Sequence, residues 1–428
     1  MPRQKNSRRN PHRPHAGSAK LDLMPVTIAI VGAGSRGTTY AASAVKAGAQ
    51  IVAVAEPRAA ARAQFTEAEH FEDWRELLER PRLADIAVIA TQDQYHAEPA
   101  VALAGKGYHL LLEKPMATSE ADCSRIVQAA EDAGVMLAVC HVLRYTPYSR
   151  ALKQVVDSGR IGDIVSVEHL EPVGWWHQAH SYVRGNWRRE DESSFMLMTK
   201  SCHDLDWLAY IIGRPAERVS SFGSLYEFRP ERKPEGAADR CLDCAIEPTC
   251  AYSAPRIYTP FLDKPHKKWP LSIVTLDRTP EGLMTALREG PYGRCVYSCD
   301  NDVVDHQVVN IEYEGGVTAS FTMTAFAAYS HRKTRIFGTR GSIDGDGETI
   351  AIHDFLNGPD VVDLGAVDGA SAADGHGGGD QAIVDAFVEA VRTGDTGLIL
   401  TNGRESLDSH RLVWAAEHAR RTGTVVRL

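Results

Sequence analysis

The sequence predicts an α/β domain with a doubly wound parallel sheet, followed by an α+β domain with a mainly antiparallel, open-faced sheet and helices. Three observations support this prediction. Strands and helices alternate over residues 26–140, and a glycine-rich turn follows the first strand. Residues 307–344 are mostly strands separated by short turns. At 428 residues, the chain is too long for one compact core and suits two domains.

Apolar runs and helix signals place the elements of the first domain. Residues 84–90 are almost continuously apolar, as expected of a parallel strand covered on both faces. Ser119 is suited to cap the helix that follows it. Strands are expected over residues 27–31, 51–55, 84–90, 108–112 and 135–140, and helical segments from residue 36 and over 74–79, 95–104 and 119–133.

The pattern changes after Pro147, where strands alternate between apolar and polar residues. Further elements are expected over 148–158 (helix), 164–170, 307–313, 317–324, 333–337 and 342–344 (strands), and 380–393 and 403–422 (helices). The proline-rich stretch over about 228–289 looks like an insertion. The predicted domains span residues 25–145 and 146–428, and the basic residues 1–24 are expected to be a disordered extension.

Bulk composition excludes some partners. A net charge of −9 with scattered acidic residues disfavours nucleic acid or an anionic membrane as a partner. No run approaches transmembrane length, and no apolar export signal follows the basic N-terminal residues. We expect a cytoplasmic protein, in which its eight cysteines favour burial or metal ligation over disulfides.

The glycine-rich turn predicts a dinucleotide site. Gly32 allows the tight turn after the strand, Gly34 lets the backbone approach the phosphates, and Gly37 lets the next helix pack closely. Glu56 ends the next strand about twenty residues on, where the adenosine ribose is expected. A carboxylate there favours NAD, whereas Arg36 and Arg58 leave NADP as the alternative.

A second motif, Glu113-Lys-Pro-Met-Ala117, follows the strand over residues 108–112. It therefore lies at the carboxyl edge of the parallel sheet, where nicotinamide and substrate meet. Pro115 disfavours a helical conformation at Lys114 and keeps that residue extended. A lysine beside a cationic nicotinamide can take a proton near neutral pH.

These motifs and the domain order resemble the Gfo/Idh/MocA family of sugar and polyol oxidoreductases, over nearly the whole chain from about residue 26. The resemblance implies an NAD(P)-binding Rossmann domain and a substrate-binding domain that also forms subunit contacts. It also implies that Lys114 hydrogen-bonds the substrate hydroxyl near the nicotinamide. The predicted cofactor-binding residues are Gly32, Gly34, Ser35, Arg36, Gly37, Glu56, Arg58, Thr91, Gln92, His96, Glu113, Lys114 and Arg144.

Residues 200–207 predict a helix that carries His203, which resembles the active-site histidine of the family. Many relatives place an aspartate one turn earlier, where this sequence has Thr199. Lys200 is an alternative charged hydrogen-bonding group, and Asp206 is expected to be a cap or a salt-bridge partner. The predicted catalytic residues are Lys114, His203 and Lys200.

Residues 175–187 are rich in aromatic, histidine and arginine side chains. Such a mixture suits a sugar, because flat apolar faces contact the ring and polar groups bind hydroxyls. The tryptophans could equally pack between domains. The predicted substrate-binding residues are Lys114, Trp176, His180, Tyr182, Arg184, Lys200 and His203, whereas Arg144 would bind a substrate carboxylate or sulfonate or tie the domains together.

Cys241, Cys244 and Cys250 have a spacing that suits one metal ion. Cys295 is the first choice for a fourth ligand, with Cys299 or His266 as alternatives. We predict a structural zinc that does not catalyse. Free or buried thiols, disulfides and an iron–sulfur centre are the other possibilities.

Together, these features predict an NAD(P)-dependent oxidoreductase that moves a hydride between a secondary hydroxyl of a sugar, inositol or sugar derivative and the nicotinamide. The resemblance leaves two alternatives. One is glycoside cleavage through transient oxidation of the sugar, and the other is a dinucleotide sensor without activity. It also implies a homodimer or homotetramer.

Overall fold

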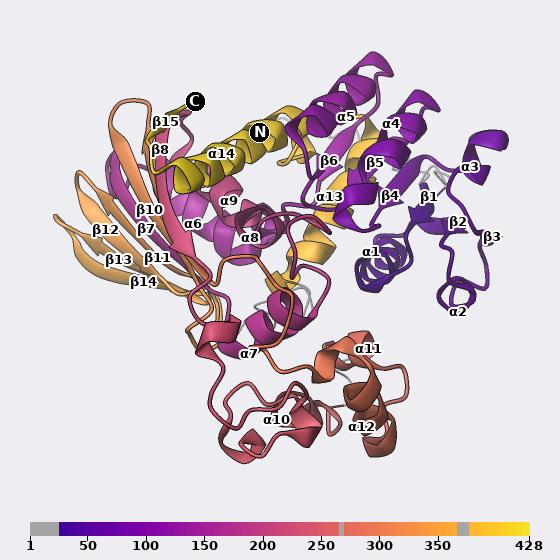
Figure 1. The fold of residues 1–428 in the computed structure, drawn as a ribbon. Coiled ribbons are helices and arrows are strands. Elements are labelled where there is room, and N and C mark those ends of the chain that lie inside the picture. The colour runs from indigo at the N-terminus through magenta and orange to yellow at the C-terminus, as the bar shows by residue number, and fades with distance from the viewer. Residues whose placement is uncertain (1–24, 265–268, 366–375) are drawn as a thin grey trace, which may run out of the picture.

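The structure is a computed structural model, which describes residues 25–264, 269–365 and 376–428. Figure 1 shows two sheets with helices between them and a smaller helical lobe below. The predicted basic extension lies outside the described residues. No helix in the described part of the chain is long and apolar enough to cross a membrane.

The first sheet is parallel and has the order β3-β2-β1-β4-β5-β6. The order reverses between β1 and β4, which creates the crevice where such sheets bind ligands. The strands are β1 (Thr27–Val31), β2 (Gln50–Ala55), β3 (Glu69–Phe71), β4 (Ile86–Ile89), β5 (His109–Leu112) and β6 (Leu137–Val139). The predicted doubly wound sheet is confirmed.

Helices cover both faces of this sheet because its strands are apolar on both sides. Ile28 and Ile30 pack with Tyr40 of α1 and Phe387 of α13, and the opposite face packs against α4 and α5. The helices are α1 (Ser35–Lys46), α2 (Ala59–Arg62), α3 (Glu76–Glu79), α4 (Ala97–Gly105), α5 (Glu120–Asp132) and α13 (Gly379–Thr393). Because α13 returns from the C-terminal region, the residue bounds of the two domains stay a prediction.

The second sheet has the order β14-β13-β12-β11-β7-β10-β9-β8-β15 and is antiparallel except where β7 pairs with β10. Its strands are β7 (Ile164–Pro172), β8 (Ala216–Ser224), β9 (His306–Tyr313), β10 (Val317–Thr324), β11 (Lys333–Gly338), β12 (Gly341–Gly345), β13 (Thr349–Asp354), β14 (Gly358–Asp363) and β15 (Val426–Arg427). The predicted mainly antiparallel sheet is confirmed.

One face of the second sheet carries the largest core, and the other is open. In β10, Phe321 and Met323 are buried, whereas the intervening Thr322 is half-buried. The core packs against α6 (Pro147–Asp157), α9 (Cys202–Ile212) and α14 (Gly403–Thr422). On the open side Phe222 remains 64% exposed.

The long connection between β8 and β9 forms the lobe in Figure 1. It contains α10 (Ala254–Tyr258), α11 (Leu271–Val274) and α12 (Pro280–Glu289). Its own core includes Cys241, Tyr258, Leu283 and Cys295, and it packs against Ala179 and Val183. The lobe therefore rests on the segment that follows β7.

A buried ion pair ties the first sheet to the helices of the second. Arg144, in the turn η2 (Val142–Tyr145) after β6, donates from Nε and Nη2 to the two carboxylate oxygens of Asp206 on α9, each at 2.8 Å. Its Nη1 donates to Glu405 of α14 at 2.7 Å. Asp206 is thus the predicted salt-bridge partner, and Arg144 ties the two parts together instead of facing a substrate.

Replacing Asp206 with Asn is expected to lower the free energy of unfolding by roughly 3–5 kcal/mol, because the buried guanidinium of Arg144 would lose its counter-charge. Urea denaturation followed by circular dichroism measures this change. Glu405→Gln is the matched control, because it removes a 55% exposed partner of the same arginine and is expected to cost at most about 1 kcal/mol. Equal losses of unfolding free energy in both variants would show that the buried Arg144–Asp206 pair has no special role in stability.

Candidate functional site

The glycine turn has the geometry that a bound pyrophosphate needs. Gly32 has φ +91°, and a Cβ there would lie 2.7 Å from the Ala90 carbonyl oxygen. A Cβ on Gly37 would lie 1.9 Å from the Gly32 carbonyl oxygen, so only glycine lets α1 pack this closely. Gly34 faces open space, where a Cβ would meet only Arg58 Nη2, at 3.8 Å. Since α1 begins at Ser35 without a side-chain cap, its first amides stay available to an anion.

Glu56 lies where the adenosine ribose is expected, at the end of β2. Its carboxylate is 4% exposed and accepts hydrogen bonds from the Ala33 amide at 2.9 Å and from Arg58 Nε at 2.7 Å. Burial alone would raise the pKa of Glu56, but the hydrogen bonds from Arg58 and Ala33 outweigh it and lower the pKa. Glu56 is therefore anionic, and the 66% exposed Arg58 side chain lies beside it.

Arg36 does not present its charge to a phosphate. Its Nε donates to Glu113 at 2.5 Å, and its Nη1 and Nη2 donate to Asp380 at 2.8 and 2.7 Å. Tyr40 also donates to Glu113 at 2.8 Å. Arg36 therefore contributes through its backbone at the start of α1, and its side chain joins α1, α13 and the end of β5.

Lys114 stands at the carboxyl edge of the first sheet, as the second motif predicts. Its amide donates to the Glu113 carboxylate at 2.6 Å, and its Nζ donates to the Thr199 carbonyl oxygen at 2.7 Å. The Lys114–Pro115 peptide is cis. Thr199 ends α8 (Met196–Thr199), so the lysine reaches across from the first sheet to the second half of the chain.

The rim beside Lys114 is built by the turn after β4. His96 is fully buried, and its ring nitrogens lie 2.8 Å from the Pro115 carbonyl oxygen and 3.3 Å from that of Thr91. Gln92 is exposed at the start of this turn. His96 therefore shapes the rim and does not face a ligand, whereas Thr91 and Gln92 lie at the strand end beside the crevice.

His203 is buried at the start of α9, and neither of its ring nitrogens has a hydrogen-bond partner among the described residues. Its ring centroid lies 5.8 Å from that of His141 and 5.7 Å from that of His376. Burial and then the Lys114 charge hold the pKa of His203 well below its usual range. His203 is therefore neutral, and both of its ring nitrogens are buried.

A charged network lies behind His203. The Nζ of Lys200 is 2.9 Å from Glu171, whose other oxygen is 3.0 Å from Arg332. Arg332 also pairs with Asp204, which accepts from the His169 ring at 3.2 Å. Lys200 is thus at the site but is already neutralised by a carboxylate.

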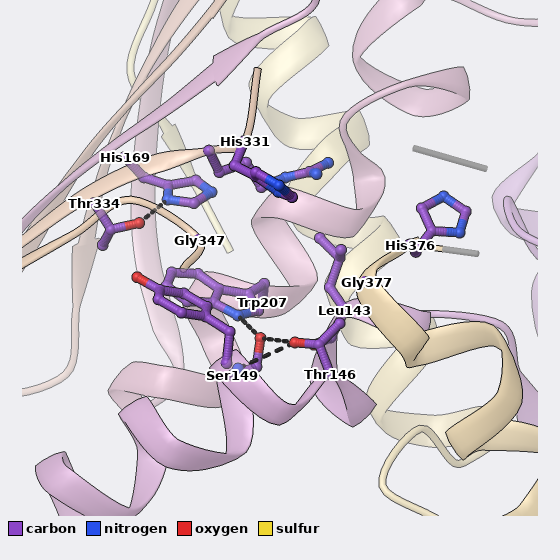
Figure 2. Close-up of a pocket in the computed structure, with 12 residues that line it drawn as sticks. Leu143, Thr146, Ser149, His169, Trp207, His331, Thr334, Gly347, His376 and Gly377 are labelled. Carbon is purple, nitrogen blue, oxygen red and sulfur yellow. Dashed lines mark hydrogen bonds between the residues drawn. The ribbon is translucent and has the colours of Figure 1, made fainter. Parts of the chain in front are cut away.

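A cavity of about 60 Å³ lies next to this network, and Figure 2 shows the side chains that line it. His376 lies on one side of it and His169, stacked on Trp207, on the other. The residues that line it are Leu143, Thr146, Tyr148, Ser149, His169, Trp207, His331, Arg332, Thr334, Gly347, His376 and Gly377. Because His376 also touches His203, this cavity adjoins the predicted catalytic residues.

Some side chains of the aromatic segment after β7, residues 175–187, lie near the candidate site, and others contact the lobe. Trp176 packs against Trp269 of the lobe and Tyr329, at 5.2 and 5.3 Å between ring centroids. The ring of His177 lies 5.2 Å from that of Trp269 and 6.0 Å from that of Tyr182. Burial, then the charge of Lys200, lowers the pKa of His177 well below its usual value, so this histidine is neutral too.

Two predicted substrate-binding residues face the lobe instead of the site. His180 is hydrogen-bonded to the Tyr258 hydroxyl at 2.9 Å and stacks on Tyr292 at 4.9 Å. Arg184 donates to the carbonyl oxygens of Tyr252 and Arg294, each at 2.8 Å. His180 and Arg184 are four residues apart and therefore share one side of the helical segment, a division that the dense aromatic pattern of the sequence concealed.

The predicted zinc site is not supported. Across residues 25–264, 269–365 and 376–428, no three His, Cys, Asp or Glu side chains are arranged to hold one metal ion. All eight cysteines are free, including Cys241, Cys244, Cys250 and Cys295. His266, an alternative ligand, lies outside the described residues.

The sequence-based prediction missed His141, Glu171 and Arg332. His141 directly follows β6 at the same edge as Lys114, so the rule that identified Lys114 could have identified His141. Glu171 and Arg332 had no comparable signal, because they meet only through the pairing of β7 with β11. His177 lies inside a segment that the prediction did single out.

The dinucleotide turn, the anionic Glu56 and the lysine at the sheet edge together define a nicotinamide-dependent oxidoreductase. The sequence matches the Gfo/Idh/MocA oxidoreductase family in two parts, the NAD-binding Rossmann fold over residues 26–141 and the C-terminal alpha/beta domain over residues 153–428. The chain belongs to this family.

Relatives and solved structures agree with this assignment. The putative oxidoreductase YteT of Bacillus subtilis is 24% identical over 338 residues, which cover 74% of this chain and 75% of YteT. The 2,7-anhydro-N-acetylneuraminate hydratase of Escherichia coli is 29% identical over 142 residues, which cover 33% of this chain and only 37% of that enzyme. A levoglucosan dehydrogenase solved with NADH and levoglucosan has a TM-score of 0.69 at 18% identity, covering 94% of this chain and 99% of that one.

Alanine at Gly34 and at Gly37 should affect the protein differently. Gly37→Ala places a methyl group against the Gly32 carbonyl and is expected to lower the free energy of unfolding by roughly 1–3 kcal/mol. Gly34→Ala meets open space and is expected to change it by less than about 0.5 kcal/mol. Both should weaken NAD binding at least about tenfold. Urea denaturation and fluorescence titration measure the two effects, and full NAD affinity in Gly34→Ala would refute the assigned phosphate approach.

The buried histidines should make the protein acid-sensitive. Burial lowers the pKa of His141 from 6.5 to about 4. Between these two pH values the ring is protonated in the unfolded chain and neutral in the folded chain. His141 therefore does not reduce the free energy of unfolding above pH 6.5, and it reduces this free energy progressively as the pH falls toward 4. Over that window, the slope of unfolding free energy against pH should be smaller in His141→Gln by about 1.4 kcal/mol per pH unit. Parallel slopes for the two proteins would contradict this role of His141.

Proposed function

We propose that this protein oxidises or reduces a secondary hydroxyl of a neutral sugar or polyol with NAD. The observation that carries the proposal is the position of Lys114. Its amine reaches from the edge of the first sheet to the Thr199 carbonyl, near His203, whose ring nitrogens have no hydrogen-bond partner in the part of the chain that the structure describes. A hydroxylated ring placed there would meet an amine that can carry a proton and a neutral hydrogen-bonding group.

The protein's own residues would position the substrate and move one proton. The glycine turn, the first amides of α1 and Glu56 would hold the cofactor, and bound NAD would supply the hydride acceptor. Lys114 in its neutral form would take the hydroxyl proton during oxidation and return it during reduction. His203, neutral because it is buried, would fix the orientation of the same hydroxyl.

The charges at the site favour a neutral substrate. Lys200 and Arg332 share Glu171, and Arg332 also pairs with Asp204. Arg144 is occupied by Asp206, so it is not proposed to bind a substrate carboxylate. A sugar hydroxyl can add a hydrogen bond to these pairs without disturbing them.

NAD is proposed over NADP because Glu56 is buried and anionic, and would repel a 2′-phosphate. The cytoplasmic location and the homodimer or homotetramer implied by the resemblance stay predictions.

Glycoside cleavage through transient oxidation is the second candidate. Neutral His177 and His203 both lie near Lys114, whose charge contributes to lowering the pKa of each. Elimination needs proton-transfer groups beyond the one that serves the carbinol, and these rings would supply them. The similarity to an anhydrosugar hydratase over part of the chain fits this candidate.

Lys114→Met should separate binding from turnover. With NAD and a panel of neutral sugars, anhydrosugars and inositols, the wild type is expected to form NADH, seen by absorbance. The variant should lose about 10²–10⁴-fold in kcat, because the proton carrier is gone. Its NAD affinity should stay within about threefold, since the phosphate contacts remain.

Lys106→Met is the matched control, because that lysine donates to the Leu78 carbonyl away from the crevice. It should keep full activity. Normal turnover in Lys114→Met would rule out the assigned proton carrier. Release of nitrophenol from aryl glycosides without net NADH would favour the second candidate.

A further inference from the structure

Four arginines line one hollow where the lobe meets the segment that follows β7. The volume of this hollow is about 400 Å³, within the range of sites that bind small organic molecules. Arg184 and Arg188 come from the segment after β7, and Arg240 and Arg294 come from the lobe. Glu289 is the one acidic residue among the described residues that line it. A chain with a net charge of −9 therefore gathers positive charge at this place.

Short contacts hold these arginines together. The Nε of Arg184 donates to the Arg294 carbonyl oxygen at 2.8 Å, and Arg240 pairs with Arg294 through an isolated β-bridge. Arg188 and Arg294 share one carboxylate oxygen of Asp300, at 2.9 and 2.8 Å. Like charges that converge repel one another unless a counter-charge lies among them. Asp300 supplies that counter-charge for two of the four side chains.

The other two arginines, Arg184 and Arg240, have no carboxylate partner. Arg184 is buried, and its hydrogen bonds go to two carbonyl oxygens and to the Cys241 sulfur. Arg240 donates from Nη2 to the carbonyl oxygens of Leu287 and Gly290, at 2.8 and 2.5 Å. None of these acceptors, in the part of the chain that the structure describes, carries a full negative charge. Since a buried charge is costly without a counter-charge, an anion in the hollow would stabilise Arg184.

Both guanidinium groups also have a buried donor without an acceptor. The Nη1 of Arg184 and the Nε of Arg240 have no hydrogen-bond partner among the described residues. Glu247 lines a small cavity that Arg184 also lines, but its carboxylate accepts from the Ser253 hydroxyl instead. An unpaired buried donor costs free energy that a ligand oxygen would recover.

The chemistry of the side chains selects the kind of anion. Guanidinium groups match phosphate oxygens in pairs of parallel hydrogen bonds, and arginine is the residue that most often serves this purpose. The volume of the hollow also leaves room for an organic group beside the phosphate.

We propose that this hollow binds the phosphate group of a small ligand. Arg184 and Arg240 bind the phosphate oxygens, and the more exposed Arg188 and Arg294 add positive charge beside them. The bound phosphate joins the segment after β7 to the lobe, because two arginines come from each. The site shares none of its lining residues with the glycine turn or Lys114, so it does not depend on the proposed reaction.

Isothermal titration calorimetry on the full chain tests the proposal, with inorganic phosphate and glucose 6-phosphate as the probes. Saturating NAD is present, so that the glycine turn is occupied, and the ionic strength is held constant with chloride. Both probes should bind saturably, and glucose alone should not. Arg188→Gln and Arg294→Gln should each weaken binding at least about tenfold, because each removes one positive charge beside the phosphate. Tighter binding of glucose 6-phosphate would identify a phosphate ester as the ligand, and equal binding would identify the free anion.

Arg288→Gln is the matched control, because Arg288 lies near the end of α12 and does not line the hollow. It should keep the full affinity for both probes. No saturable binding of either probe would overturn the proposal, as would unchanged affinity in Arg188→Gln and Arg294→Gln. If these variants fail to fold, a phosphate-soaked crystal of the wild type decides the question. Density for phosphate at Arg184 and Arg240 would support the site, and its absence there would overturn it.

Discussion

The architecture of the active region depends on one buried cation, the Arg36 guanidinium. It sits between Glu113, which precedes the lysine at the sheet edge, and Asp380, at the start of α13. It supplies a counter-charge to both buried carboxylates. Because Glu113 also accepts the Lys114 amide, helix α1 and Lys114 are held in a fixed relation to each other. His376, bonded to Asp380 at 2.9 Å, extends the same set of contacts to His203.

Helix α9 connects the chemistry with the stability of the fold. Its first turn supplies His203, which has no hydrogen-bond partner among the described residues, and Asp204, which pairs with Arg332. Farther along, Asp206 binds Arg144 from the other half of the chain. His203 and Asp206 are three residues apart and both lie near His141, so one side of this short helix carries a predicted site residue and a residue that ties the two halves of the chain together.

The sequence predicted strands well where they are apolar and buried. The bounds of β1, β10 and α14 agree to the residue with the predicted ones, because their periodicity is unambiguous. The prediction missed β8, β13 and β14. These strands contain polar or exposed residues and lie near the edges of the second sheet. At the candidate site, chain-local motifs predicted the glycines and Lys114, and the family resemblance predicted His203. Local motifs could not show that Arg36 pairs with Asp380 and Arg144 with Asp206, because these partners are 344 and 62 residues away in the sequence.

The lobe places Trp269 against His177, so a segment that contributes nothing to the first sheet shapes the surroundings of a histidine in the segment after β7. Lengthening or exchanging the lobe would change the surroundings of His177 without disturbing Lys114, the glycine turn or Arg36. Such an arrangement allows new preferences for substrates to evolve by insertion, while the reaction itself stays under separate selection.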